Sequence, residues 1–176
     1  MKRIAIIGSG DLALQIAYHA VNDCCHSVVG FYDDFEACGV LKNNIPILGN
    51  TAEVITGFEQ NKFDCLAIGV GYKNMAKRGE LFDVFKGKIP FINIIHSSCT
   101  IDKNAKIGEG VVLFPGCVID MNTTISDNVL LYTGCIVSHD VFIGKDTMFS
   151  PGVTTSGFVT IGQKVSLGTG TLISNN

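Results

Sequence analysis

The sequence lacks any apolar run that approaches the roughly 20 residues that a helix needs to cross a bilayer. Its start, MKRIAIIGSG, is too short and too interrupted by glycine for a signal peptide. It also lacks a cluster of lysine and arginine, and its net charge of −3 argues against nucleic acid or an anionic membrane as the main partner. We therefore expect a cytoplasmic protein that acts on a small molecule.

The spacing of the cysteines lacks the pattern of a metal or redox site. None of the seven cysteines forms a C-x-x-C pair, and an odd number fits poorly with a disulfide framework. We expect reduced cysteines and no bound metal. Charged residues are also scarce, at 16%, whereas hydrophobic residues make up 47%, which is enough for a packed core and too apolar for disorder.

The first half of the chain alternates short apolar runs with helical patterns. Strands are predicted at residues 2–7, 27–32, 63–70 and 91–95, and helices at residues 11–20 and 73–85. Alternation of this kind is typical of a parallel sheet in an α/β domain. We predict such a domain, Rossmann-like in architecture, over residues 1–94.

Glycines and acidic residues lie where the predicted strands end. They are Gly8, Ser9, Gly10, Asp33, Asp34 and Gly69. Because ligands bind beyond the carboxyl ends of the strands in an open parallel sheet, one crevice could use all of them. Glycines let a phosphate approach backbone N–H groups, and a carboxylate can accept hydrogen bonds from a ribose or a base. This predicts a nucleotide site, with two alternatives: a redox dinucleotide, or tight turns without a ligand.

From residue 101 onward the sequence repeats every six residues without an insertion. The leading positions are Ile101, Ile107, Leu113, Ile119, Ile125, Leu131, Val137, Ile143, Phe149, Thr155, Ile161, Leu167 and Ile173. Only Thr155 among them is not apolar. Such a repeat predicts a prism-shaped parallel β-helix in which three hexapeptides make one coil. We place this domain at residues 95–176.

A coil of eighteen residues would stack Cys99, Cys117 and Cys135 in one column, about 4.8 Å apart along the axis. Small side chains packed inside a narrow coil account for this column without any chemical reactivity. The handedness of the helix does not follow from the repeat, because the general rule for parallel connections favours right-handed crossovers.

Several motifs together resemble one known family. They are Gly8-Ser9-Gly10, Phe31-Tyr32-Asp33-Asp34-Phe35, Ala67-Ile68-Gly69, Ile95-His96-Ser97-Ser98, the hexapeptides, and Val137-Ser138-His139-Asp140. In combination they resemble the bacterial sugar-nucleotide acetyltransferases, which include amino-sugar N-acetyltransferases of bacillosamine-type glycan pathways and related sialic acid O-acetyltransferases. The resemblance covers nearly the whole chain.

The resemblance implies a left-handed β-helix, a homotrimer, and acetyl-CoA as a co-substrate bound between neighbouring helices. It also implies that the amino-terminal domain holds a nucleotide-linked amino sugar, expected to be a UDP- or dTDP-amino-dideoxy sugar. Asp33 and Asp34 match the positions that contact the nucleotide. Nothing in the resemblance suggests a nucleic acid or a membrane as a partner.

For the β-helix, the resemblance implies that His139 is the catalytic base and that Asp140 orients it. Gly157, one coil after His139, and Thr169 match places where backbone groups meet the pantetheine arm of acetyl-CoA. A neutral imidazole can accept a proton near pH 7, so an acceptor amine would attack the thioester directly, with no cysteine nucleophile. A backbone N–H near Gly157 would stabilise the developing oxyanion.

Three departures from the family and two rival functions remain open. Asp11 replaces a histidine in the first glycine loop, Met148 stands where many members have a second histidine, and we expect that the end at Asn176 leaves out final coils and a tail that closes around CoA. The first rival is O-acetylation, because the same base could activate a hydroxyl group. The second is a non-catalytic trimer that binds a nucleotide or is purely structural.

Overall fold

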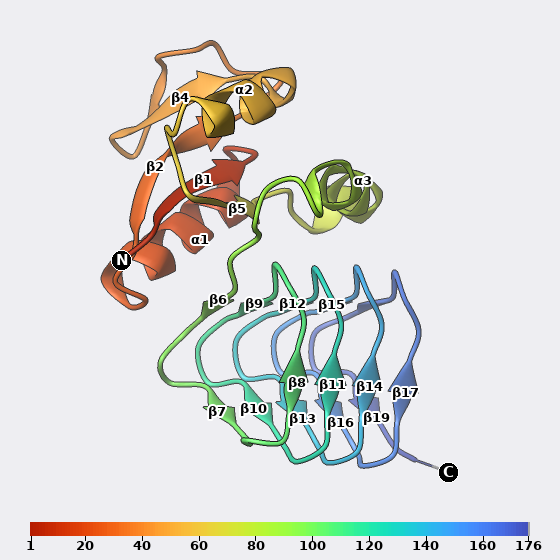
Figure 1. Ribbon diagram of the computed structural model, residues 1–176. Coiled ribbons are helices and arrows are strands. Elements are labelled where there is room, and N and C mark those ends of the chain that lie inside the picture. The colour runs from red at the N-terminus through yellow and green to blue at the C-terminus, as the bar shows by residue number, and fades with distance from the viewer. Residues whose placement is uncertain (176) are drawn as a thin grey trace. The chain divides into compact units, whose positions relative to one another are not determined.

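The computed structural model describes residues 1–175 and divides the chain into two compact units, Met1–Ile92 and a second unit that begins at Asn93. Each unit has its own hydrophobic core. In Figure 1 the first unit is a sheet with helices, and the second is a stack of coils coloured from green to blue. No helix among the described residues is long and apolar enough to cross a membrane.

The first unit contains a five-stranded sheet with the order β3-β4-β2-β1-β5. Its elements are β1 (Arg3–Ile7), α1 (Asp11–Asn22), β2 (Ser27–Tyr32), β3 (Leu41–Lys42), β4 (Ile45–Gly49), α2 (Val54–Glu59), β5 (Cys65–Ile68) and α3 (Met75–Phe85), with short 3₁₀ helices at Thr51–Glu53 and Tyr72–Asn74. All neighbouring pairs are parallel except β3 with β4.

Strand β1 lies in the middle of this sheet and is covered on both faces. Ala5 and Ile7 pack in one cluster with residues of α2 and α3, whereas Ile6 lies on the side where Gly69 meets Ala13 of α1. This burial explains why the strand is a continuous apolar run, as expected for a parallel sheet between two layers of helices.

The order of the strands reverses direction beside β1. From β1 the chain goes to β2 and β4 on one side, and then crosses to β5 on the other side. The carboxyl ends of β1 and β5 therefore form the switch point at which open α/β sheets bind ligands. A Cβ atom on Gly8 would come within 3.3 Å of the backbone of Gly69, so the two glycines that end these strands lie close together.

The predicted strand at residues 91–95 is wrong, because this apolar run is divided between the two units. Phe91 forms a single parallel bridge with Leu66 of β5. The side chain of Asn93 then donates to the carbonyl of Gly108 at 2.8 Å and accepts from the N–H of Val111 at 2.9 Å. These bonds start the first coil of the second unit, which begins with β6 (Ile94–Ile95).

The second unit is a β-helix with three parallel sheets, each formed by one strand per coil. Its later strands are β7 (Thr100–Ile101), β8 (Lys106–Ile107), β9 (Val112–Leu113), β10 (Val118–Ile119), β11 (Thr124–Ile125), β12 (Leu130–Leu131), β13 (Ile136–Val137), β14 (Phe142–Ile143), β15 (Met148–Phe149), β16 (Thr154–Thr155), β17 (Thr160–Ile161), β18 (Ser166–Leu167) and β19 (Leu172–Ile173). The regular stacking of the strands, visible in Figure 1, confirms the β-helix and fits the left-handed form that the resemblance implies.

The register between coils is eighteen residues throughout, as in the pairing of Ile119 with Val137. The leading residues of the hexapeptides face the interior, where they form one core with the small residues four positions later. The period therefore predicted correctly which side chains are inside the prism.

The three cysteines of the predicted column lie inside this core. Cys117 and Cys135 are fully buried, and each thiol lies close to a backbone carbonyl of the following coil. The hydrogen bond with Cys135 and burial raise the pKa of the Cys117 thiol to about 12. This thiol stays protonated at neutral pH, so it packs as a small apolar group.

Candidate functional site

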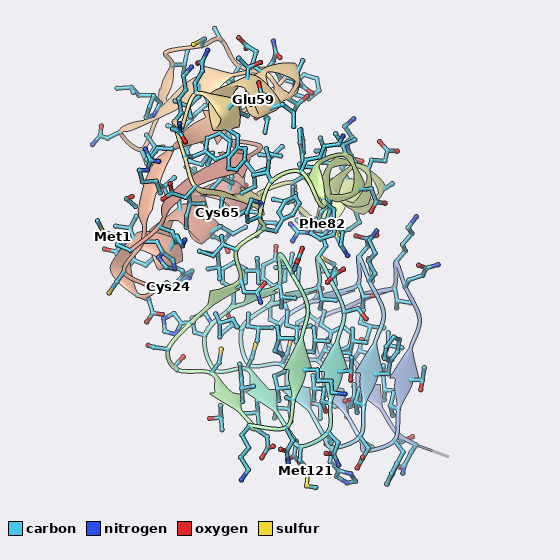
Figure 2. The ribbon with its side chains drawn as sticks, in the orientation of Figure 1. Met1, Cys24, Glu59, Cys65, Phe82 and Met121 are labelled. Atoms are coloured by element: carbon cyan, nitrogen blue, oxygen red, sulfur yellow. The ribbon has the colours of Figure 1, made fainter. Side chains whose placement is uncertain are left out.

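The corner of the β-helix between β13 and β14 carries His139 and Asp140. In two successive coils the chain turns here through a residue with positive φ, Asn122 at 58° and Asp140 at 56°. Asn and Asp tolerate the left-handed region because their short polar side chains bond locally. The side chain of Met121, one coil before His139, points away from the prism in Figure 2. His139 occupies the same outward position.

A hydrogen bond fixes one side of the imidazole ring. Nδ1 of His139 lies 2.9 Å from Oδ2 of Asp140, and the other carboxylate oxygen accepts a bond from the Asn122 amide at 3.1 Å. An ionised carboxylate can only accept, so Nδ1 carries the proton and Nε2 of the neutral ring keeps the lone pair. The bond from His139 lowers the pKa of the Asp140 carboxyl, which therefore stays ionised at neutral pH.

Gly157 provides the surface on which the imidazole lies. A Cβ atom at this position would be 2.5 Å from Cε1 and 2.7 Å from Nε2 of His139, far inside normal contact distance. Gly157 is buried under the ring, whereas 44% of the His139 side chain is exposed. The glycine is thus required by the close approach of the ring one coil away.

Phe158, which was not predicted from the sequence, lies against the same ring. Its ring centroid is 5.1 Å from that of His139, and the two rings are nearly perpendicular, at 87°. The signal was present in the repeat, because residue 158 stands one coil after Asp140 and two coils after Asn122. At this position the third coil has a bulky phenylalanine, whereas the two preceding coils have residues suited to the turn.

The other β-helix residues named from sequence lie away from this corner. Thr169 is exposed in the turn between β18 and β19, a different corner of the prism from the turn that holds His139. Met148 lies in β15 and is buried, with 6% of its surface exposed. Neither residue shares a turn with His139, and the predicted role of Thr169 in binding the cofactor stays a prediction.

In the first unit, the glycine loop is tied to the end of β2. Ser9 is buried, and its hydroxyl donates to Oδ2 of Asp33 at 2.7 Å, while the N–H of Gly8 donates to the carbonyl of Tyr32. Gly10 precedes α1, whose start has no side-chain cap. The first N–H groups of the helix are therefore available to an anion, although Asp11 already places a negative charge there.

Asp34 is also held by the protein. Its two carboxylate oxygens accept from the N–H of Thr51 at 2.8 Å and from the Thr51 hydroxyl at 3.0 Å. Asp33 accepts a second bond from the N–H of Phe35, a residue that is 97% exposed. Each carboxylate oxygen has a further lone pair, so both residues can still accept hydrogen bonds from a ligand.

A pocket of about 100 Å³ lies beside these residues. It is lined by Ile7, Gly8, Tyr32, Asp33, Asp34, Phe35, Thr51, Val70, Asn74, Lys77 and Leu81. The predicted residues Ser9, Gly10 and Gly69 are nearby but do not line it. Because binding pockets for small molecules are typically about 300–1,000 Å³, this one can hold only part of a nucleotide.

Lys77 and Asn74 belong to this pocket and were not predicted from sequence. Lys77 is half-exposed, with Nζ 3.6 Å from a carboxylate oxygen of Glu80, and it brings a positive charge to a pocket lined by two aspartates. Only the fold places α3 beside the ends of β1 and β2, so the spacing of the sequence could not reveal these residues. Among residues 1–175, no group of three potential metal ligands is gathered in one place.

No model of a protein family matches the chain, and no curated protein matches it. Solved structures do. A mutant of perosamine N-acetyltransferase from Caulobacter crescentus, in complex with CoA and GDP-perosamine, is 21% identical with a TM-score of 0.80, over 97% of this chain and 87% of that chain. The acetyltransferase domain of PglB from Neisseria gonorrhoeae, in complex with acetyl coenzyme A, is 20% identical with a TM-score of 0.72, over 98% and 93%. WeeI from Acinetobacter baumannii is 22% identical with a TM-score of 0.78, over 96% and 78%. The chain shares the fold of these proteins.

Proposed function

We propose that this protein is a sugar-nucleotide acetyltransferase that transfers the acetyl group of acetyl-CoA to the amino group of a nucleotide-linked amino sugar. The observation that carries the proposal is the imidazole of His139, which Asp140 holds at Nδ1 and which lies over Gly157. The fold is shared with an N-acetyltransferase that binds CoA and GDP-perosamine and with an acetyltransferase domain that binds acetyl coenzyme A.

In this proposal His139 is the general base. The amine nitrogen of the sugar attacks the thioester carbonyl carbon, and Nε2 of His139 takes the proton that the nitrogen loses. Asp140 accepts the Nδ1–H bond and stabilises the imidazolium that forms. When the tetrahedral intermediate collapses, the C–S bond breaks and the imidazolium returns a proton to the departing thiolate. A backbone N–H near Gly157 donates to the oxyanion, a contact typically worth about 2.7–4 kcal/mol.

The first unit supplies the nucleotide site. The uncapped start of α1 and the close pair Gly8 and Gly69 suit a phosphate group, which needs exposed N–H groups and a close approach to the backbone. Asp33 and Asp34 suit a ribose or a base, because both present carboxylate oxygens at the end of β2. We expect a UDP- or dTDP-amino-dideoxy sugar as the substrate, and GDP sugars belong in the test because one protein of this fold binds GDP-perosamine.

The test is to incubate the protein with acetyl-CoA and a panel of UDP-, dTDP- and GDP-linked amino sugars and to follow the release of free thiol. His139→Ala should lower kcat by about a hundred-fold or more, since general bases typically contribute 10²–10⁴. Asp140→Asn should cost less. His26→Ala, which removes a histidine of the first unit, is the matched control and should keep wild-type turnover.

Two outcomes would favour the rival functions. Products whose acetyl group is lost in mild alkali would indicate O-acetylation by the same base. No turnover of the wild type with any acceptor would favour a binding or structural role. Wild-type turnover in purified His139→Ala would instead contradict the proposed role of His139 as the general base.

We also propose that the protein is a homotrimer. Outward side chains of β10, β13 and β14 are apolar and partly exposed, namely Val118, Ile136 and Phe142. Burial of these faces against copies of the same chain would remove apolar surface from water. Sedimentation equilibrium should give three times the chain mass of 18.8 kDa, and a monomer at micromolar concentration would contradict the trimer.

A further inference from the structure

The backbone at Phe158 adopts a conformation that aromatic residues avoid. Its φ angle is 60°. Among the described residues, ten non-glycine residues have positive φ, and seven of them are Asn or Asp. Phe158 is the one aromatic residue in this set, and for a bulky residue such an angle is a genuine outlier.

The stack of coils shows what the turn ordinarily requires. Asn122 and Asp140 occupy the equivalent position in the two preceding coils, with φ angles of 58° and 56°. Both have side chains that tolerate this region, and both take part in the hydrogen bonds that hold the corner. Nothing in the turn itself therefore requires a phenyl group.

Phe158 does not fill the core either, because it is 69% exposed. The described contact of its ring is the perpendicular one with His139, at 5.1 Å between centroids. Its N–H donates to the carbonyl of His139 at 3.1 Å, so the two residues are also joined through the backbone. A strained and exposed aromatic residue held against a candidate base points to a role at the site, since such strain persists where function requires it.

We infer that Phe158 is a positioning residue for the imidazole of His139. Three groups then define the orientation of the ring. Asp140 holds Nδ1, Gly157 lets the ring lie close to the next coil, and Phe158 blocks the direction in which the exposed ring would otherwise rotate. Nε2 is thereby kept at one place relative to the acceptor amine. This inference rests on the proposed acetyltransferase function.

The decisive variant is Phe158→Asn, which restores the residue type found at this turn two coils earlier. The fold should be retained and stabilised, with a Tm higher by about 2–4 °C, because Asn relieves the strain. In contrast, kcat should fall about ten- to a hundred-fold, because a small misplacement of a catalytic group is costly. The KM for acetyl-CoA should change by less than about two-fold, since a group that acts only in the transition state alters kcat.

Two further variants separate positioning from a general need for an aromatic surface. Phe158→Tyr keeps the ring and should keep most of the wild-type kcat. Tyr18→Ala removes another exposed aromatic ring that lies perpendicular to a histidine, His19 of the first unit, at 5.3 Å between centroids, so it should leave kcat unchanged. Wild-type kcat in Phe158→Asn, or an equal loss in Tyr18→Ala, would overturn the inference.

Crystal structures of the wild type and Phe158→Asn provide a measurement that does not depend on activity. We expect one conformer of His139 over Gly157 in the wild type and several in the variant. A single unchanged conformer in the variant would overturn the positioning role even if turnover were measurable. If the wild type acetylates no acceptor but the conformers differ as expected, the proposed function fails and the positioning of His139 by Phe158 stands.

Discussion

Gly157→Ala is the most direct perturbation of the candidate site, because it adds one methyl group beneath the imidazole. The new carbon would lie 2.5 Å from Cε1 and 2.7 Å from Nε2 of His139. Carbon atoms in contact are normally about 3.5–4.0 Å apart, so the ring must retreat by roughly 1 Å. A displacement of about 1 Å can cost about a hundred-fold in rate, and we expect a loss of this size in kcat.

The same change should leave the fold intact. The φ angle of Gly157 lies outside the left-handed region, so alanine fits the backbone there. With 44% of its side chain exposed, His139 can move into solvent instead of straining the coil. Replacing glycine by alanine at a compatible position also stabilises a protein by about 0.4–1 kcal/mol through the unfolded state. The Tm should therefore stay at or slightly above that of the wild type.

The assay is thiol release at saturating acetyl-CoA and amino sugar, combined with thermal unfolding of the same samples. Gly162→Ala is the control, because its nearest neighbour would be 3.9 Å from the added carbon; it should leave kcat unchanged and keep Tm at or slightly above that of the wild type. If Gly157→Ala turned over at the wild-type rate, the imidazole would not act from its position over residue 157, and the geometric basis of the mechanism would be refuted.

Three further predictions concern stability and nucleotide binding. Thr155→Val should raise the free energy of unfolding by about 1–3 kcal/mol, because the fully buried Thr155 hydroxyl has no hydrogen-bond partner within residues 1–175. Thr123→Val is the control: it removes a hydroxyl that donates to the carbonyl of Ser138 at 2.8 Å, so it should lower the free energy of unfolding. A loss of stability in both Thr155→Val and Thr123→Val would refute the argument. Asp34→Ala should raise KM for the sugar nucleotide and lower stability by about 1 kcal/mol, because its hydrogen bonds with Thr51 are lost. Unchanged affinity in calorimetry would reject its place in the site. The pKa of Asp140 is lowered, so its ionised carboxylate stabilises the fold above about pH 4, and this stabilisation is lost as the pH falls through the lowered pKa. The urea midpoint of Asp140→Asn should therefore depend less on acid pH than that of the wild type.

The sequence was most informative where its period matched the geometry of the fold. A repeat of six without insertions determines which residues face the interior, so the core of the β-helix and the cysteine column could be predicted. The same period placed Gly157 one coil after His139, and the structure brings the two into contact.

Other features depend on contacts that have no period. The hairpin of β3 and β4 was not predicted, because β3 has only two residues and gives no alternating pattern. In the structure, Asn43 and Asn44 at its turn both have positive φ. The run at residues 91–95 reads as one strand, and only the hydrogen bonds of the Asn93 side chain show that it is divided. Lys77 reaches the pocket of the first unit through the packing of α3, which no local pattern encodes.

The register of eighteen residues also limits how this chain can change in length. One residue inserted or deleted within a strand of the β-helix would turn the side chains after it in that strand to the opposite face, because side chains alternate between the two faces of a strand. Between His139 and Gly157, such a frameshift would in addition separate two residues that touch only because one full coil lies between them. Gain or loss of a whole coil away from this corner preserves both the core and the contact. Turns can absorb shorter insertions, but the prism itself is expected to grow or shrink in units of eighteen residues, and designers who wish to lengthen or shorten it have the same unit at their disposal.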